Sequence, residues 1–435
     1  METSNDYLLK LNDLIQCDTV SGSPFLNEKK SKEFQAVLEN TFPHIFSKCR
    51  IINIDGSLII ELLGKRSSAP TLFISHFDTV EATGEWEHNP FSAEIENGKI
   101  FGRGVFDSKG NLFCILEALD ELINEGYIPS QDFYIAISCD KESDDKSIEK
   151  IYTYFKNCNI YFSYILDEGG CVVNKPLNEL NNDYALVGLG EEASAILKIV
   201  SLKQGGHASV PLKDSALVNL AQFIDDFNYN NVFHKSIHKS LHDTFFKVSR
   251  DMTGYDKFIF SHSRLCSPLV KLSLAKQPLV LPLIQSSLSF ITIYGSDNIN
   301  VITSEAYAIA NLRISLNDSL EKCLKKIRKF ARRYHLKVEV LKEDKMPRVT
   351  SDNSYQYLTI ESTIKEIFND VAVIPYITCS TTDSRVMNRL CSTCYRFVPF
   401  KVTKDQISRV HGLDENIDVD NLEKAISFYK KLIKK

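Results

Sequence analysis

Residues 107–138, DSKGNLFCILEALDELINEGYIPSQDFYIAIS, combine the two periodicities on which the prediction of the fold rests. In the first half, apolar residues recur three and four positions apart, at Leu112, Ile115, Leu116, Leu119, Leu122 and Ile123. That spacing places them on one stripe of an α-helix, and Gly126 and Pro129 supply its stop signals. The second half ends in FYIAIS, a short apolar run that is typical of a buried strand. The segment therefore predicts a helix followed by a buried strand.

The same alternation of short apolar strands and amphipathic helices extends along the chain from about residue 70. It is typical of an α/β protein whose sheet carries helices on both faces. Between residues 191 and 345 the expected order changes to β-α-β-β-α-β, which fits a small sheet with two helices on one face. We therefore predict a larger domain with a mixed sheet, formed by residues 1–190 and 346–435, and an inserted α+β domain at 191–345.

The composition is that of a soluble globular protein, with 43% hydrophobic and 25% charged residues. The 51 basic and 56 acidic residues give a net charge of −5, so the totals indicate neither a nucleic acid nor a membrane as a partner. The eleven cysteines are scattered and odd in number, and the N-terminal residues lack a basic segment followed by an apolar one. We therefore expect reduced thiols and a cytoplasmic location.

Polar clusters follow several of the expected strands. Because ligands bind beyond the carboxyl ends of strands in α/β sheets, these loops are expected to converge. Any one of these short motifs is more often a surface or core feature than a binding site, so the prediction rests on the whole set. Imidazoles with carboxylates suit zinc, and bridging carboxylates suit two metal ions about 3.5–4 Å apart. The candidate residues are His76 and Asp78 of SHFDTV, Asp107 of GRGVFDSKG, Glu142 of CDKES, Asp167 of ILDEGG and His411 of VHGLDE.

Seven motifs in chain order give a more specific resemblance. They are SHFDTV, WEHNPFSAEIENGKIFGRGVFDSKG, ILDEGG, GGHASVP, GSDNINVI, TTDSR and VHGLDE. Together they resemble the aminoacylase/carboxypeptidase family of di-zinc metallopeptidases (clan MH), most closely its vacuolar carboxypeptidase S-like branch, in which the form LDEGG also occurs. The resemblance spans nearly the whole chain. It implies a zinc exopeptidase-like catalytic domain, and an inserted domain that serves as a lid and often as a dimerisation domain.

Position by position, the resemblance implies a ligand set for two zinc ions, although such oxygen-rich sites also accept Co²⁺ or Mn²⁺. His76 and Asp167 would bind one ion, Glu142 and His411 the other, and Asp107 would bridge both. Asp78 would hold the ring of His76 and so fix its tautomer.

The resemblance also implies roles for three residues of the inserted domain. His207 of GGHASVP would donate to the developing oxyanion, as the matching histidine of family members does, often across a dimer interface. Asn300 and Arg313 would hold the polar end of the substrate, and an arginine is suited to a carboxylate because it forms two parallel hydrogen bonds. The implied reaction is hydrolysis of a peptide or N-acyl amide bond in a small substrate, and a homodimer is the implied assembly.

One position departs from the family pattern. The family reads Asp-Glu-Glu, in which the first Glu is the general base and the second a zinc ligand, whereas this chain reads Asp140-Lys141-Glu142. Lys141 therefore occupies the position of the base. A shifted register, with Glu142 as the base and Asp144 as the ligand, is the alternative.

Three consequences of Lys141 compete. Two nearby divalent cations disfavour the charged form of a lysine, so a neutral Lys141 could act as the base. The hydrolase could instead be slow, because loss of a positioned base typically costs roughly 10²–10⁴-fold. The protein could also be a pseudoenzyme that binds metal and ligand without turnover. A further alternative is that the site binds no metal ion at all. Residues 228–285 show no pattern that predicts which substrate side chain is preferred.

Overall fold

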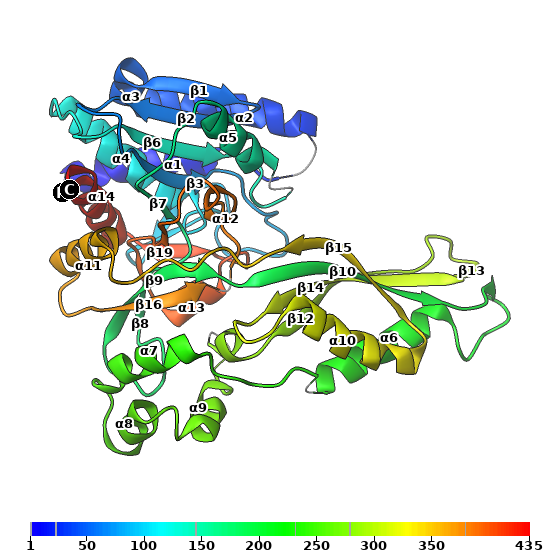
Figure 1. Ribbon diagram of the computed structural model, residues 1–435. Helices are drawn as coiled ribbons and strands as arrows, with labels where there is room; N and C mark the ends of the chain where they lie inside the picture. The colour runs from blue at the N-terminus through cyan, green and yellow to red at the C-terminus, as the bar shows by residue number, and fades with distance from the viewer. Residues whose placement is uncertain (1, 22–23, 144–145, 231, 278–279, 379) are drawn as a thin grey trace. The chain divides into compact units, whose positions relative to one another are not determined.

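The computed structural model describes residues 2–21, 24–143, 146–230, 232–277, 280–378 and 380–435 (Figure 1). The chain divides into two compact units, one formed by Met1–Gly190 with Arg348–Lys435 and the other by Glu191–Pro347. The first boundary coincides with the expected one at residue 190, and the second lies two residues beyond the expected residue 345.

The larger unit is built on a mixed ten-stranded sheet in the order β1-β2-β6-β3-β7-β17-β9-β8-β18, with β16 paired to β9. The strands β6, β3, β7 and β17 at its centre are parallel, whereas β1, β2 and β6 pair antiparallel. The strands are β1 (Arg50–Ile54), β2 (Ser57–Leu62), β3 (Thr71–His76), β6 (Phe133–Ser138), β7 (Tyr164–Asp167), β8 (Val172–Asn174), β9 (Asp183–Glu191), β16 (Ala372–Thr378), β17 (Cys394–Arg396) and β18 (Lys401–Val402). A small separate sheet contains β4 (Glu94–Glu96), β5 (Lys99–Phe101) and β19 (Asn416–Asp418).

Helices cover both faces of this sheet, as predicted. Alternate residues of β3 point to opposite faces, so Phe73 belongs to one core cluster and Leu72 and Ile74 to the other. The first cluster is covered by α1 (Glu2–Gln16), α2 (Pro24–Thr41), α3 (Pro43–Lys48), α4 (Lys109–Asn124), α11 (Tyr355–Ile367) and α14 (Asp420–Lys434). The second is covered by α5 (Lys146–Asn157) and α12 (Ser384–Met387), while α13 (Lys404–Ser408) precedes β19.

Helix α4 confirms the helix predicted from the opening segment, but it is buried on more than its apolar stripe. It packs against α1, α3, α14 and β3. Polar residues are therefore buried on it too, and Glu117, which is 2% exposed, accepts a hydrogen bond from Lys10 Nζ at 2.7 Å. The spacing of apolar residues predicts the apolar stripe of α4. It does not predict that other helices cover the remaining faces of α4.

The smaller unit has the predicted order β-α-β-β-α-β. Its antiparallel sheet runs β12-β14-β10-β15, made of β10 (Ala193–Leu202), β12 (Ser287–Tyr294), β14 (Glu305–Ile314) and β15 (Lys337–Asp344). The helices α6 (Ala216–Tyr229) and α10 (Leu320–Ala331) pack on one face of it. Ala306, Ala308 and Ala310 of β14 are buried there, and their small side chains let the helices approach the sheet closely.

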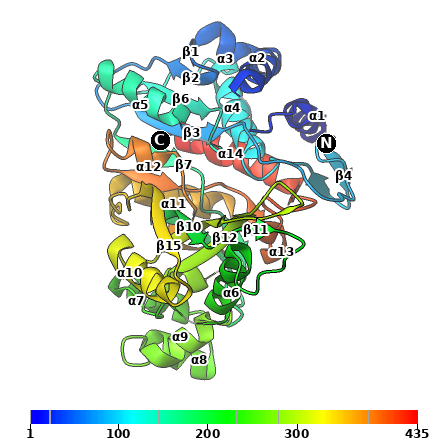
Figure 2. The same cartoon turned by 90° about the vertical axis from the view of Figure 1, so that its right-hand side faces the viewer.

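The smaller unit also contains elements that the sequence did not predict. A two-stranded sheet joins β11 (Gly206–His207) to β13 (Val301–Ile302). Short helices α7 (Lys239–Ser249), α8 (Gly254–Ser261), α9 (Ser267–Leu274) and η1 (Leu281–Ile284) occupy most of the segment between α6 and β12, and η2 (Arg332–Tyr334) follows α10. Figures 1 and 2 both show α8 and α9 apart from α6 and α10.

Candidate metal centre

Three neighbouring parallel strands bring the candidate residues to one edge of the central sheet. The sheet order β6-β3-β7 places the ends of these strands side by side, and His76 at the end of β3 pairs in register with Ser138 at the end of β6. Strand β7 ends at Asp167. The loops that follow parallel strands open at the same edge, which is where α/β sheets place their ligand sites.

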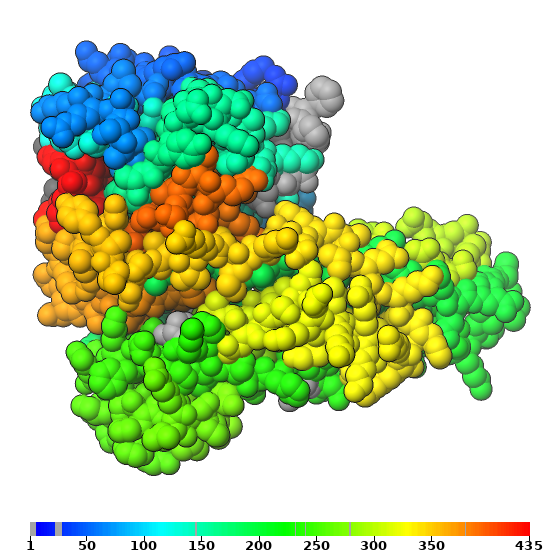
Figure 3. Space-filling model, in the orientation of Figure 1, coloured from blue at the N-terminus to red at the C-terminus, as the bar shows by residue number. Residues whose placement is uncertain are grey.

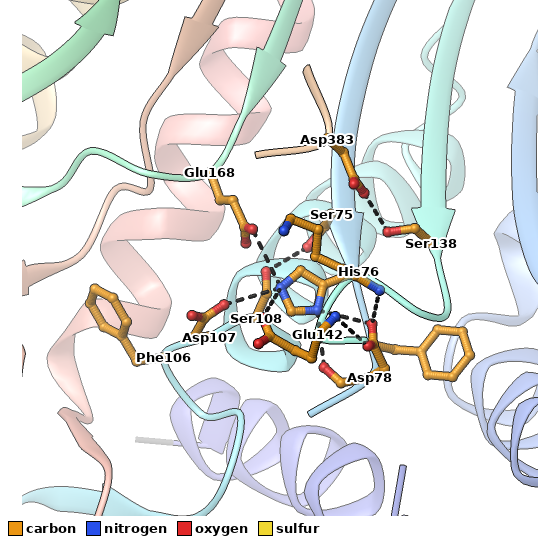
Figure 4. Close-up of polar contacts among 12 residues, drawn as sticks. Ser75, His76, Asp78, Phe106, Asp107, Ser108, Ser138, Glu142, Glu168 and Asp383 are labelled. Atoms are coloured by element: carbon orange, nitrogen blue, oxygen red, sulfur yellow. Dashed lines mark hydrogen bonds and ion pairs between the residues drawn. The ribbon is translucent and has the colours of Figure 1, made fainter. Parts of the chain in front are cut away.

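The centre of the cluster is the imidazole of His76, which is 1% exposed. Its Nε2 lies 3.0 Å from Asp107 Oδ1, 3.3 Å from Glu168 Oε1 and 3.8 Å from Glu142 Oε1. Figure 4 shows the side chains of Asp107 and Glu168 directed toward this ring. One nitrogen and three carboxylates therefore converge on a single point.

A second imidazole contacts two of the same carboxylates. His411 Nε2 lies 3.2 Å from Asp107 Oδ2 and 3.3 Å from Glu142 Oε2. The two oxygens of Asp107 therefore face different histidines, as expected of a carboxylate that bridges two cations. Hydrogen bonds from Asp107 and Glu142 raise the pKa of His411 to about 10, so without a metal ion this histidine carries a proton.

The tautomer of His76 makes the cluster suitable for a cation. Its Nδ1 lies 3.0 Å from the carbonyl oxygen of Asp78 and 3.3 Å from Asp78 Oδ1, and both of these atoms are acceptors. Nδ1 therefore carries the hydrogen, and the lone pair on Nε2 of the neutral ring faces three carboxylates. Burial alone would lower the pKa of His76, but Glu168 and Asp107 hold it well above its ordinary value. Either a proton or a metal cation therefore occupies the position that Nε2 faces.

The donor set fits a metal ion. His76, Asp107 and Glu142 each offer one nitrogen or oxygen atom, and these atoms lie within 4.8 Å of one another. Imidazole and carboxylate donors without a thiolate are suited to zinc or a similar divalent ion. Glu168 and His411 add one donor each through the contacts described above.

Asp78 contacts the ring of His76 and also accepts hydrogen bonds from the backbone before and at Glu142. Its Oδ1 accepts a hydrogen bond from the backbone N–H of Lys141 at 3.1 Å, and its Oδ2 accepts from Glu142 N at 2.8 Å and from Ser21 Oγ at 2.6 Å. Burial acts to raise the pKa of Asp78, but the hydrogen bond and the charge of His76 outweigh this effect and hold the pKa below its ordinary value. The carboxylate therefore stays ionised. Asp78 therefore lies between the ring of His76 and the backbone that carries Glu142.

The structure places the two adjacent carboxylates of ILDEGG differently. Asp167 Oδ1 accepts a hydrogen bond from Glu168 N at 2.9 Å, and its Oδ2 accepts from Ser384 N, at the start of α12, at 2.6 Å. Burial and the charge of Glu168 raise the pKa of Asp167 to about 6. Glu168 faces His76 instead, because adjacent residues of an extended segment point to opposite sides. ILDEGG contains both carboxylates, and the structure places Glu168 rather than the expected Asp167 beside His76, so we carry Glu168 forward as the proposed ligand.

A buried ion pair joins the loops that carry Asp107 and His411. Glu415 Oε2 lies 2.9 Å from Arg103 Nη1, and Glu415 Oε1 accepts hydrogen bonds from the backbone N–H groups of Phe106 and Asp107 at 2.9 and 3.1 Å. Arg103 Nη2 also donates to the carbonyl oxygen of Gly412 at 2.9 Å. Sequence reasoning missed this pair, although both residues lie inside quoted motifs, GRGVFD and VHGLDE.

Lys141 lies three residues after the end of β6 and is half-buried beside Glu142. Because Glu142 contacts both imidazoles, the geometry favours the register in which Glu142 is a ligand; Asp144, the ligand of the alternative register, lies outside the described residues. Asp140 accepts hydrogen bonds from Lys146 N and Ser147 N at the start of α5, at 3.2 and 3.1 Å. Its carboxylate therefore caps the N-terminus of that helix.

The structure places His207 and Asn300 together in the smaller unit. The β11–β13 pairing sets His207 opposite Val301, and Ala208 N donates to the carbonyl oxygen of Asn300 at 3.0 Å. His207 is exposed, and its Nδ1 accepts a hydrogen bond from Ser209 N at 3.1 Å. In the neutral ring, Nε2 therefore carries the hydrogen and is a donor.

Arg313 is not brought close to these two residues. It pairs with Ser194 at the start of β10, whereas β11 follows the end of β10. The length of β14 from Glu305 to Arg313 separates the two ends, roughly 26 Å at about 3.3 Å per residue.

The chain is similar to known proteins in both sequence and fold. The profile of peptidase family M20/M25/M40 matches residues 72–435. The chain is 28% identical over 429 residues to the N-fatty-acyl-amino acid synthase/hydrolase PM20D1.1 of Danio rerio, covering 96% of this chain and 83% of that protein. It is 31% identical over 417 residues to the probable carboxypeptidase S-like 2 of Dictyostelium discoideum, covering 94% and 80%. The crystal structure of human carnosine dipeptidase 1 shares the fold, with a TM-score of 0.71 at 13% identity over 99% of this chain and 96% of that one.

Proposed function

The chain belongs to peptidase family M20/M25/M40, and from that premise we propose that it is a zinc-dependent hydrolase of a peptide or N-acyl amide bond in a small substrate. The observation that carries the proposal is that His76 Nε2 faces three carboxylates, two of which also contact His411. The two relatives described above are named for hydrolysis of N-fatty-acyl amino acids and for carboxypeptidase-like activity, which supports an N-acyl amino acid or a short peptide as the substrate.

Five side chains would hold two metal ions in this proposal. His76 and Glu168 would bind one ion, Glu142 and His411 the other, and Asp107 would bridge them. When bound, two divalent ions polarise the scissile carbonyl and lower the pKa of a water molecule. Metal analysis after reconstitution tests the set: two equivalents of zinc support it, and fewer than one equivalent contradicts it.

The chain's own donors would orient the substrate and stabilise developing charge. His207 would donate from Nε2–H to the developing oxyanion, a contact that strengthens as the charge forms. Arg313 would bind a substrate carboxylate through two hydrogen bonds, and Asn300 would hold a polar group beside His207. In an N-acyl amino acid, the scissile carbonyl and the carboxylate are only a few bonds apart.

The separation of His207 from Arg313 supports a homodimer. Two groups at opposite ends of β14 do not both contact one small substrate if they come from the same rigid sheet. We therefore propose that one subunit supplies Arg313 and its partner supplies His207 and Asn300. Mixing the inactive variants His207→Ala and Glu142→Ala tests this arrangement, because the mixed dimer contains one complete site. Dimers that mix without regaining activity would contradict it.

Lys141 favours a second candidate function. A lysine stands at the position of the general base, and Asp140 is committed to the start of α5. A protein with this site could bind metal and an amino-acid-like ligand without turnover. The comparison with PM20D1.1 and the carboxypeptidase S-like protein supports an active hydrolase, whereas Lys141 supports the binding protein.

The variant Lys141→Glu separates the two functions. If the native protein lacks a base, the variant should gain roughly 10²–10⁴-fold in kcat on N-acyl amino acids or dipeptides. If Lys141 itself moves the proton, the same variant should lose activity. Lys141→Gln is the matched control, since it removes the charge without adding a base. Failure of both the zinc-loaded native protein and Lys141→Glu to cleave a broad substrate panel would refute the hydrolase.

A further inference from the structure

The charge of this protein is unevenly distributed along the chain. Residues 232–286 contain eight lysines and arginines and three aspartates, a net charge of +5, whereas the whole chain carries −5. The rest of the chain therefore carries −10. The basic segment corresponds to α7, α8, α9 and η1 of the smaller unit, which we call the α7–α9 module. Figure 3 shows the atoms of this segment gathered in one lobe.

The α7–α9 module has an inner apolar side that is already packed. Phe245 of α7 and Phe260 of α8 meet edge to face with ring centroids 5.7 Å apart. Val270 and Leu274 of α9 are 0% and 1% exposed. Further apolar residues on the outside of the module are therefore not needed for its own core.

Large apolar side chains nevertheless cover part of its outer surface. Tyr255 and Phe258, three positions apart on α8, are 69% and 56% exposed. On and just before α9, Leu265, Leu269 and Leu272 recur at helical spacing and are 84%, 41% and 60% exposed. Residues spaced three and four apart share one helix face, so each of these helices presents an apolar stripe to solvent.

Basic side chains alternate with these stripes. Lys257 precedes Phe258, Arg264 precedes Leu265, and both are exposed. On α7, the guanidinium of Arg250 lies 5.5 Å from the ring centroid of Phe246, which is itself 50% exposed. Aromatic and leucine side chains interleaved with lysine and arginine are typical of helices that lie in the interface of an anionic membrane.

We propose that the α7–α9 module binds peripherally to the surface of an anionic phospholipid membrane. The apolar stripes would enter the boundary between headgroups and acyl chains, while the lysines and arginines contact lipid phosphates. No helix among the described residues is long and apolar enough to cross a bilayer. The proposal departs from our expectation of no membrane partner, which rested on the total charge.

The composition of the surface favours a membrane over a protein partner. The centres of protein–protein interfaces are depleted in lysine, whereas this surface intersperses lysines among its apolar residues. The same unit offers an internal contrast: α10 exposes Lys322, Lys325 and Lys329, but none of its described residues is an exposed large hydrophobic. Charge alone therefore predicts α10 as the binding site, and charge combined with apolar stripes predicts the α7–α9 module.

Co-sedimentation of the full chain with vesicles tests the proposal. We expect binding to phosphatidylcholine vesicles that contain phosphatidylserine, weaker binding to phosphatidylcholine alone, and loss of binding as salt increases. The double variant Lys257→Gln/Lys276→Gln should weaken binding about 25-fold, from about five-fold for each positive charge removed. The double variant Phe258→Ser/Leu272→Ser should weaken it at least about ten-fold.

Matched controls come from the same unit. Lys329→Gln on α10 and Leu341→Ser on β15, where Leu341 is 55% exposed, should leave vesicle binding within about two-fold. All these positions are exposed, and circular dichroism checks that each variant is folded. Absence of binding to either vesicle, or equal losses in the control and module variants, would overturn the proposal. So would a result in which Phe258→Ser/Leu272→Ser abolishes self-association and leaves vesicle binding intact. The readout needs no substrate, so it is independent of whether Lys141 permits turnover.

Discussion

The substitution Glu415→Gln should destabilise the protein and weaken its metal site together. Glu415 is 0% exposed and is the only carboxylate with a described ion pair to Arg103, whose side chain is 2% exposed. The amide of glutamine retains an oxygen that can accept from Phe106 N and Asp107 N. It loses the negative charge opposite the guanidinium, so the substitution isolates the ion pair from the backbone hydrogen bonds.

The expected cost follows from the contacts. Removing one partner of a buried ion pair costs about 3–5 kcal/mol, because the other charge remains buried. The guanidinium of Arg103 keeps its hydrogen bond to Gly412 O and its position 4.9 Å from the ring centroid of Trp86, so we expect the lower end, about 3 kcal/mol. Glu415→Ala also removes the acceptor for two buried N–H groups, at about 1 kcal/mol each, and should cost about 5 kcal/mol.

Two measurements check this prediction. Urea unfolding of the metal-free protein gives the change in stability, and zinc titration gives the change in affinity. We expect about 10–100-fold weaker zinc binding, because Glu415 aligns the loops that carry Asp107 and His411. The control is Arg409→Gln in the same loop: Arg409 pairs with Asp405 at 2.8 Å, but their side chains are 37% and 62% exposed, so its loss should cost less than about 1 kcal/mol. If Glu415→Gln behaves like Arg409→Gln in both assays, the pair does not join the two loops and the reasoning is refuted.

Three further predictions concern the ligand set and one buried carboxylate. Glu168→Gln should reduce the zinc stoichiometry from two to one, whereas Asp167→Asn should leave it at two; the reverse result would restore Asp167 as the ligand. Asp78→Asn should weaken zinc binding about 10–100-fold in the same titration, because it supports both His76 and Glu142. Burial raises the pKa of Glu192 to about 8 from an ordinary 4.5, despite the charge of Arg313. The folded state therefore binds one proton more than the unfolded state between these values, and stability falls as pH rises through this window. Urea unfolding at several pH values should show a smaller loss for Glu192→Gln than for the native protein.

Much of the larger unit follows from local patterns in the sequence. The helix α4 and the strand β6 satisfy their own periodicities, so the opening segment predicted both. The convergence of His76 and Glu142 was also predictable, because parallel neighbouring strands must end at the same edge of a sheet. These inferences succeed where one element or one pair of adjacent elements decides the geometry.

The sequence is less informative where several elements act together or where one residue changes the direction of a side chain. Asp167 and Glu168 are adjacent, and only the hydrogen bond from Ser384 N, which is 217 residues away in the chain, shows which carboxylate turns toward α12. The pairing of Arg103 with Glu415 spans 312 residues, and no spacing rule connects them. The helices α7, α8 and α9, each of 8 to 11 residues, give apolar patterns that are too brief to separate from loops.

Asp78 holds the backbone of Lys141. Asp78 accepts hydrogen bonds from both Lys141 N and Glu142 N, and these contacts involve the backbone, so they are available to any residue at position 141. The side chain of Glu142 contacts both His76 and His411. A glutamate at position 141 would therefore keep the backbone contact to Asp78. This is why the activity of Lys141→Glu reports on the proton-transferring group itself, and why the metal stoichiometry of that variant should remain that of the native protein. A change in stoichiometry would mean that Lys141 helps to hold the metal ligands. The activity of the variant would then not report on proton transfer alone.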